Sequence, residues 1–266
     1  MKESTRVREN LGGGYAGINS VEVAGEILLQ LAECRHPTTH KALSERCHLT
    51  PSKVHRYLSS LAKLGLVFHG TKSGNYSLGK NAILVGLAAM QQNDQIDEVI
   101  QQLPELVKKL KHHVFLSVWS MAGPTIIKWE RSDDSLVIGL PLGQALPVSH
   151  SACGRVFAAF LDAAITRDLI AQERLSYGDK TIRSDEEFQS TLKIIRERHF
   201  AIQRGEIESE VTAIAVPVFD WENNPVVVVG STVSKHTDED SIMVITEALT
   251  KFARELSVRK PSFPFE

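Results

Sequence analysis

Residues 49–65 constrain the fold of the N-terminal third more tightly than any other part of the chain. They read Leu-Thr-Pro-Ser-Lys-Val-His-Arg-Tyr-Leu-Ser-Ser-Leu-Ala-Lys-Leu-Gly. Thr50 is a favourable N-cap, and Pro51 follows at the first helical position, where its missing N–H costs nothing. Gly65 suits the left-handed conformation that commonly ends a helix. The sequence therefore predicts a helix from residue 51 to about residue 64 with locally fixed ends.

The segments on either side complete a recognisable order of elements. Two helices are expected before this one, over about 21–34 with Ser20 as N-cap, and over about 38–47. Two short strands, about 66–69 and 76–78, are expected after it, around a turn-rich loop. Three short helices followed by a small β-hairpin are typical of a winged helix-turn-helix.

The 51–64 helix has one apolar side and one polar side. Val54, Leu58 and Leu61 share a narrow sector and are expected to face the core, with Tyr57 half-buried beside them. The polar side carries hydroxyl and basic side chains and no acid, which suits a DNA major groove; a guanidinium can bind a guanine edge or a phosphate. An ordinary solvated face is the alternative. The candidate DNA contacts are Thr50, Ser52, Lys53, His55, Arg56, Ser59, Ser60 and Lys63, with Lys72 in the hairpin loop.

The charge distribution agrees with this interpretation. The whole chain has a net charge of -2, but residues 1–80 contain 11 Lys/Arg and 6 Asp/Glu. The remaining residues contain 19 and 26, so the two parts carry balances of +5 and -7. A basic first third indicates that this part alone meets a polyanion.

The chain length of 266 residues predicts two domains. Residues 1–17 are expected to form a flexible tail, 18–79 the winged helix-turn-helix, 80–92 a linker helix and 93–260 a second domain. In that domain helices are expected over about 95–112, 151–161, 164–174, 184–198 and from Thr237, and strands over about 114–120, 125–130, 136–140, 212–219 and 226–234. The fold class is α+β, with a mixed α/β second domain of mainly antiparallel pairing.

The cysteines and the apolar runs bear on the compartment. Cys34, Cys47 and Cys153 are odd in number and widely spaced, which argues against a disulfide framework. The N-terminus lacks the apolar core of a signal peptide, and the longest apolar run, about 82–90, is far below the roughly 20 residues of a membrane span. We expect a cytosolic protein with no membrane partner.

Several segments together resemble a known family. Residues 49–61, 64–67 and 76–79 are similar to the DNA-binding domain of the IclR family of bacterial transcription regulators. Residues 146–155 and 213–220 are similar to its second domain. The resemblance runs from about residue 18 to residue 256. It implies a GAF-like effector domain, dimers often paired into tetramers, binding to double-stranded operator DNA, and control by small metabolites, frequently organic acids.

The resemblance also implies a set of ligand-binding positions. It points to Ser151, Ala152, Gly154, Glu206, Ala215, Ser231 and Val233. The expected helix start at residues 151–154 independently supports an anionic effector, because free amides at a helix N-terminus attract a carboxylate. The alternative is that Ser151 only caps the helix and Gly154 only allows close packing.

Three positions depart from the family pattern. Ser44 and His48 stand where its helix-turn-helix usually has alanine and glycine, so His48 is expected to adopt a left-handed conformation. Glu210 stands where a glycine is frequent, and it would form an acidic cluster with Glu206 and Glu208. That cluster could favour a less acidic or even a cationic effector.

Three other functions compete with this assignment. Ser149, His150, Ser151 and Cys153 suggest a nucleophile, but neighbouring residues are not expected to face one another and no Gly-x-Ser-x-Gly motif accompanies them. The Cys and His residues between 34 and 48 lack the paired spacing of a metal site. The winged helix could serve protein contact alone. We expect no catalytic residue, no cofactor and no metal.

Overall fold

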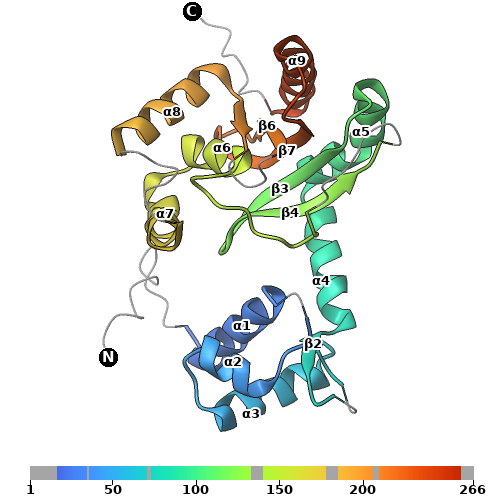
Figure 1. The fold of residues 1–266 in the computed structure, drawn as a ribbon. Helices are drawn as coiled ribbons and strands as arrows, with labels where there is room; N and C mark the ends of the chain where they lie inside the picture. Colours follow the sequence, from blue (N-terminus) through green and yellow to red (C-terminus); the bar gives the residue numbers. More distant parts are fainter. Residues whose placement is uncertain are drawn as a thin grey trace, which may run out of the picture. The chain divides into compact units, whose positions relative to one another are not determined.

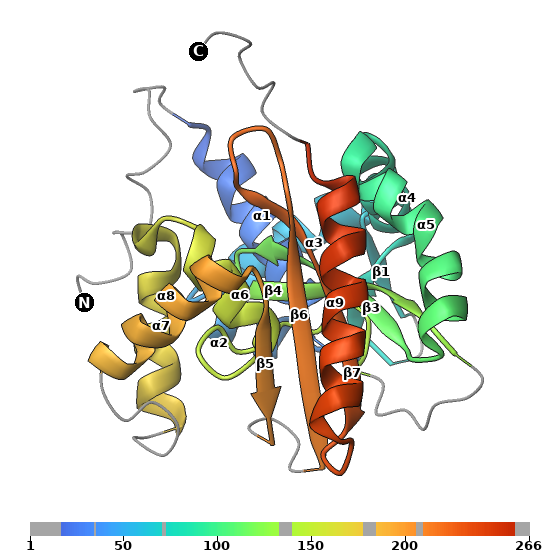
Figure 2. The same cartoon turned by 90° about the horizontal axis from the view of Figure 1, so that it is seen from above.

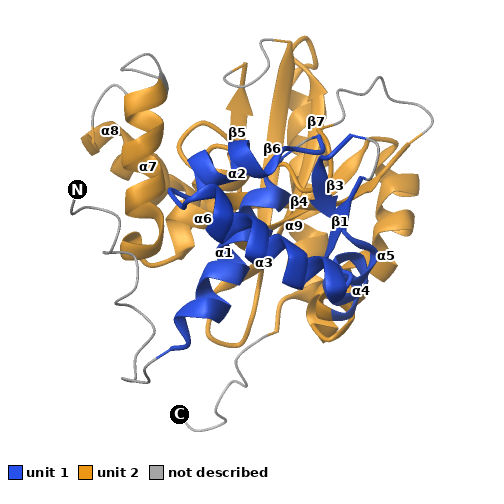
Figure 3. Cartoon of the chain, turned by 90° about the horizontal axis from the view of Figure 1, so that it is seen from below, with its two compact units in different colours: residues 1–88 blue, residues 89–266 orange. Residues whose placement is uncertain are grey.

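A computed structural model describes residues 17–34, 36–70, 73–132, 140–177, 185–205 and 210–258. The chain divides into two compact units, residues 1–88 and 89–266 (Figure 3). The division falls inside α4 (Lys80–Gln91), the segment expected to be a linker helix. None of the described helices combines the length and the apolar character that crossing a membrane requires.

The first unit is a winged helix-turn-helix. It contains α1 (Asn19–Ala32), α2 (His40–Arg46), α3 (Pro51–Lys63) and the antiparallel hairpin of β1 (Val67–His69) and β2 (Tyr76–Leu78) (Figure 1). Apolar residues of all three helices and of the hairpin form one buried core. The expected cap of α1 is wrong: the helix begins at Asn19, and Ile18 precedes it without a side-chain cap.

The turn between α2 and α3 accommodates both departures from the family pattern. His48 has φ 52°, so the expected left-handed conformation is confirmed. Ser44 is buried, and its hydroxyl donates a hydrogen bond of 2.6 Å to the Leu49 carbonyl oxygen. The Leu49 amide in turn donates to the Ser44 carbonyl oxygen at 3.0 Å. The larger serine side chain therefore stabilises the turn that places α3.

Because His48 is held at positive φ, replacing it with glycine should stabilise the first unit. An L residue in the left-handed region is disfavoured by about 1 kcal/mol relative to glycine. His48→Gly should therefore raise the free energy of unfolding by up to that amount, whereas His48→Ala should not raise it. Urea unfolding of both variants measures the difference, and equal stabilities would contradict the explanation.

The second unit is built on one antiparallel sheet in the order β4-β3-β7-β6-β5. Its strands are β3 (Val114–Ser120), β4 (Gly123–Glu130), β5 (Ala201–Arg204), β6 (Val211–Phe219) and β7 (Pro225–Ser234). Its helices are α5 (Asp94–Leu110), α6 (Ala152–Phe160), α7 (Ala163–Tyr177), α8 (Asp185–Arg198) and α9 (Glu239–Leu256). The mixed, antiparallel α/β domain is confirmed.

Three local expectations for this unit need correction or fall outside the described residues. Strand β5 was not expected, because four residues are too few to establish an alternating pattern. The expected strand at 136–140 lies almost wholly within residues 133–139, outside the described part. Residue 184, where the helix over 184–198 was expected to begin, also lies outside it. The cap of α9 is Asp238, whose carboxylate accepts the Ser241 amide at 2.8 Å, and not Thr237.

Helices cover both faces of the sheet, with α5 and α9 on one face and α6 and α8 on the other (Figures 1 and 2). The alternation of side chains along each strand assigns every residue to a face. On β7, Val227 and Val229 pack with α5 and α9, whereas Val228 packs with α6. This alternation decides which of the expected ligand-binding residues lie on the same face and can share a site.

Candidate nucleic-acid interface and ligand site

Helix α3 presents the expected two sides. Val54, Leu58 and Leu61 are buried in the core of the first unit, and Tyr57 is half-buried against it. Its exposed polar residues are Ser52, Lys53, His55, Arg56, Ser59, Ser60 and Lys63. Thr50 caps the helix, since its hydroxyl accepts the Lys53 amide at 3.4 Å.

The polar side of α3 keeps its cations unpaired. Within the described part of the chain, Lys53, Arg56 and Lys63 form no ion pair. Ser59 and Ser60 donate their hydroxyl protons to the carbonyl oxygens of His55 and Arg56, at 2.9 and 3.2 Å. Their oxygen lone pairs stay available as acceptors, and the three basic side chains are free charged donors.

The hairpin beside α3 is held by an aromatic contact. The rings of His69 and Tyr76 stack with centroids 4.3 Å apart, and Tyr76 also exchanges backbone hydrogen bonds with Thr38. Lys72 lies outside the described residues, so its expected contact stays a prediction.

At the head of α6, both structural roles considered for Ser151 and Gly154 are present. The Ser151 hydroxyl accepts the Gly154 amide at 2.8 Å and donates to the Pro147 carbonyl oxygen at 2.6 Å. A Cβ atom on Gly154 would lie 2.3 Å from the carbonyl oxygens of both Pro147 and Val148. Gly154 is thus required for close packing, and its amide is already bonded within the chain.

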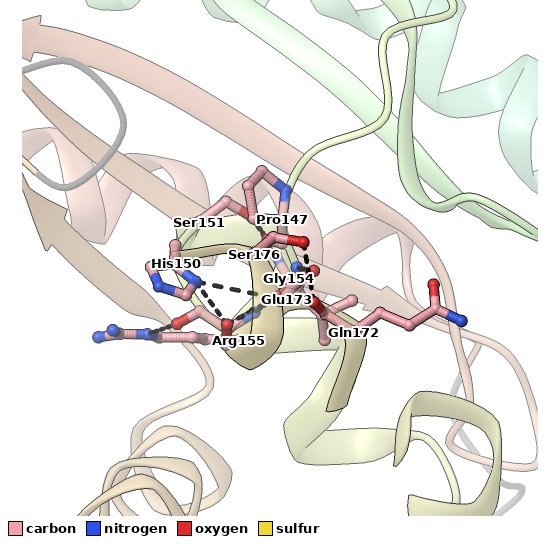
Figure 4. A network of polar contacts seen from close by, with 10 residues as sticks. Pro147, His150, Ser151, Gly154, Arg155, Gln172, Glu173 and Ser176 are labelled. Atoms are coloured by element: carbon pink, nitrogen blue, oxygen red, sulfur yellow. Dashed lines mark hydrogen bonds and ion pairs between the residues drawn. The ribbon is translucent and has the colours of Figure 1, made fainter. Parts of the chain in front are cut away.

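Just before α6, a carboxylate from α7 binds the backbone (Figure 4). Glu173 accepts hydrogen bonds from the Val148 amide at 2.5 Å, the Ser149 amide at 2.9 Å and the Ser149 hydroxyl at 2.5 Å. His150 Nδ1 lies 2.5 Å from the Ser149 oxygen and 3.7 Å from the Glu173 carboxylate. Arg155 donates to the Ser149 carbonyl oxygen at 2.8 Å.

This arrangement corrects one expectation, and its hydrogen-bond directions differ from those of a catalytic triad. Ser149 and His150 do face each other, although they are neighbours in sequence. The Ser149 hydroxyl has a single proton, which the Glu173 carboxylate accepts, so the Ser149 oxygen accepts a proton donated by His150 Nδ1. His150 is therefore not placed to take a proton from Ser149, whose side chain is 0% exposed.

The structure does not bring all the expected ligand-binding residues together. Ala152 and Ala215 share the buried cluster on the α6 side of the sheet. Val233 packs in the cluster with α5 and α9, and Ser231, two residues before it, points to the same side. The Ser231 hydroxyl donates to the His113 carbonyl oxygen at 2.7 Å. Because side chains alternate along a strand, a shift of one residue in alignment moves a position to the opposite face.

The same alternation identifies residues that the sequence interpretation missed. Gln203, Ala213 and Thr232 are register partners on β5, β6 and β7, and all three face α6. Gln203 is buried, and its Oε1 atom has no hydrogen-bond partner within the described residues. The period of two in β6 and β7 could have placed Thr232 on the side opposite Ser231 and Val233, whereas β5 was too short to be recognised.

The expected acidic cluster receives no support from Glu210. This residue is 60% exposed and pairs with Lys235, whose hydrogen bond holds the pKa of the Glu210 carboxyl below its usual value. Glu206 and Glu208 lie outside the described residues, so the expected role of Glu206 stays a prediction.

Two of the three cysteines, Cys47 and Cys153, are poor nucleophiles. Burial raises the pKa of the Cys153 thiol to about 12, and burial together with the Glu26 charge raises that of Cys47 to about 11. Both thiols are therefore protonated at neutral pH. Among the described residues, no three His, Cys, Asp or Glu side chains come together in a group that could hold a metal ion.

A winged helix with a basic, acid-free exposed helix, joined to a separate α/β domain, is the domain organisation of a DNA-binding transcription regulator. Comparison with known proteins makes the assignment specific. The IclR helix-turn-helix domain matches residues 20–68, and the bacterial transcriptional regulator IclR C-terminal domain matches residues 87–258. The chain belongs to the IclR family of transcription regulators.

Individual relatives agree with the family assignment. The glycerol operon regulatory protein of Streptomyces coelicolor is 26% identical over 216 residues, 81% of this chain and 84% of the relative. An IclR transcriptional regulator from Alicyclobacillus acidocaldarius has a TM-score of 0.79 at 24% identity, covering 91% of this chain and 98% of that one. An IclR homologue from Microbacterium hydrocarbonoxydans, complexed with 4-hydroxybenzoate, has a TM-score of 0.70 at 17% identity, covering 89% and 98%.

Proposed function

We propose that this transcription regulator binds a roughly palindromic operator through α3, and that a small organic acid or related metabolite in the second unit controls that binding. The observation that carries the first part is the exposed side of α3. It combines unpaired Lys53, Arg56 and Lys63 with hydroxyl side chains and contains no acid. A helix of this composition can both neutralise phosphates and read base edges in a major groove.

Selection from a pool of random duplexes tests DNA binding without knowledge of the operator. The protein should enrich a sequence with two related half-sites about one helical turn, or a multiple of it, apart. Binding to the enriched duplex should weaken steeply as salt rises, because phosphate contacts release counterions. Failure to enrich any sequence would favour a winged helix that contacts only proteins.

One observation supports an effector in general, and a second supports its place on the α6 side of the sheet. The Microbacterium relative has been solved with 4-hydroxybenzoate, a carboxylate. In this chain, the buried Oε1 atom of Gln203 lacks a donor among the described residues and stands in register with Ala213 and Thr232. A buried acceptor without a partner is costly, and a ligand hydroxyl could satisfy it.

A thermal-shift screen of small carboxylates, phenolics and sugars identifies candidate effectors, since a ligand that binds the native state raises the melting temperature. The stabilisation by such a compound should shrink in Gln203→Leu, which removes the buried acceptor at similar volume. Gln189→Leu, on the exposed side of α8, is the matched control and should respond like the wild type. A compound that stabilises both variants equally would place the effector elsewhere.

We further propose that the regulator acts as a homodimer, which two half-sites require, and that dimers can pair into tetramers. Helix α4 supports self-association, because none of its residues is buried in the single chain. Its large apolar side chains are exposed: Ile83 64%, Leu84 64%, Val85 60% and Leu87 54%. An apolar patch of this kind on a folded protein commonly marks an interface.

The double variant Ile83→Glu/Leu87→Glu should dissociate the dimer, because each charge would be buried unpaired at the interface. Sedimentation velocity should then show mostly monomer at concentrations where the wild type is dimeric. Gln91→Glu, exposed on the same helix, is the control for added charge and should stay dimeric. If the double variant stays dimeric, the dimer interface does not include this side of α4.

Effector binding would then act on DNA binding through α4, which connects the two units. This is a coupling between two sites. Solution scattering with and without effector tests it, and identical curves would contradict a change in the arrangement of the units. We propose no catalytic step and no cofactor for this function, in keeping with relatives that are transcription regulators.

A further inference from the structure

We propose that the backbone of residues 147–150 is a carboxylate-binding site whose resident ligand is the chain's own Glu173, and that this contact latches α7 to the head of α6. The inference goes beyond DNA and effector binding, and it does not depend on either.

The site is built from donors that point at one carboxylate. The amides of Val148 and Ser149 and the hydroxyl of Ser149 all donate to Glu173, at 2.5, 2.9 and 2.5 Å. Both carboxylate oxygens are used, one by Val148 and the other by Ser149. Successive backbone amides that converge in this way form an anion-binding nest. Val148 is 1% exposed and Ser149 is 0% exposed, so both backbone amides would be left without partners if the carboxylate were removed.

Helix α7 has few other anchors. Among its described side chains, Thr166 is buried, and Leu169 and Ile170 pack partly against the α6-side cluster. Its other large apolar residues face solvent, with Ile165 49% and Leu175 88% exposed. A helix with so little buried apolar surface depends on its polar contacts for its position. Among the side chains of α7 that the structure describes, the Glu173 carboxylate accepts the most hydrogen bonds from outside the helix.

The latched segment leads directly into α6. Pro147 accepts the hydroxyl proton of Ser151, the α6 cap, and its carbonyl oxygen lies against Gly154. Arg155, in the first turns of α6, donates to the Ser149 carbonyl oxygen. Release of Glu173 would thus loosen α7 together with the segment that positions the start of α6, the helix that faces the candidate effector residues.

Hydrogen exchange followed by mass spectrometry tests the latch on the full-length protein. In Glu173→Ala, exchange in peptides covering residues 147–150 and α7 should be at least about tenfold faster than in the wild type, because several hydrogen bonds to a charged group are lost. Peptides from β6 and α9 should be unchanged. Asp168→Asn removes one negative charge from the exposed side of the same helix and should exchange like the wild type.

Acetate then distinguishes a carboxylate site from a general structural role. Added to Glu173→Ala, acetate should restore slow exchange to residues 147–150 but not to α7, whereas chloride at the same ionic strength should restore neither. Unchanged exchange in the variant, or equal acceleration in β6 and α9, would overturn the latch. Failure of acetate to protect residues 147–150 would overturn the carboxylate site.

If Glu173→Ala does not fold, Ser149→Ala is the second variant, because it deletes one of the donors to Glu173. Exchange in residues 147–150 and α7 should again be faster than in the wild type, by a smaller factor. Exchange at the wild-type rate in Ser149→Ala would also refute the latch.

Discussion

Replacing Arg56 with alanine is expected to weaken binding to the enriched duplex by roughly 10- to 100-fold, the equivalent of about 1–3 kcal/mol for a bidentate base contact. Arg56 is exposed near the middle of α3 and carries no ion pair within the described chain. Its removal therefore breaks no ion pair within the described chain, and the thermal unfolding temperature should be unchanged. Fluorescence anisotropy with the selected duplex measures the loss.

Two further variants show whether the loss of DNA affinity is specific to Arg56 and which contact causes it. Arg254→Ala, exposed on α9 and far along the chain, is the matched control and should bind like the wild type. Arg56→Lys separates the two roles of the guanidinium: a phosphate contact should survive in large part, whereas a guanine contact should lose discrimination at one base position. If Arg56→Ala binds normally with an unaltered salt dependence, α3 does not read DNA as proposed.

Replacing Gly154 with alanine is expected to destabilise the second unit by about 3 kcal/mol, near the upper end for an overpacked core position. The added Cβ would meet the carbonyl oxygens of Pro147 and Val148 at 2.3 Å and the Val148 Cα atom at 2.5 Å. These are backbone atoms held by the Ser151 cap and by Glu173, so they cannot turn aside as a flexible side chain would. Denaturant unfolding followed by tryptophan fluorescence reports on this unit, which contains Trp119, Trp129 and Trp221.

Gly86→Ala, in the first unit, is the control for a glycine-to-alanine change, and its unfolding is followed by circular dichroism because all three tryptophans lie in the second unit. No atom lies within 4 Å of the Cβ it would add, and the residue is exposed in the interior of α4. Alanine there should be neutral or stabilising by up to about 1 kcal/mol, because it lowers the entropy of the unfolded chain and favours the helix. Similar stabilities of the two variants would show that the segment before α6 can shift to make room.

Sequence alone determined the first unit almost completely. The ends of α3 follow from Thr50, Pro51 and Gly65, and its buried side from the spacing of three apolar residues, all of which are local properties. The left-handed conformation of His48 was likewise predictable, because a helix-turn-helix needs a positive φ at that position. The exposed basic side of α3 needed no tertiary information, since a residue four positions along a helix lies on the same side whatever the helix packs against.

Which residues of the second unit can share the proposed effector site was decided by tertiary structure. A resemblance can place Ser231 on the correct strand, but only pairing in the sheet shows that its hydroxyl faces α5 and α9, and that Thr232 faces α6 beside Gln203. The contact of Glu173 with Val148 and Ser149 joins residues 24 and 25 positions apart, and no periodicity relates them. Helical and strand periods are imposed by the backbone and can be read along the chain, whereas contacts between elements depend on how the chain folds back on itself.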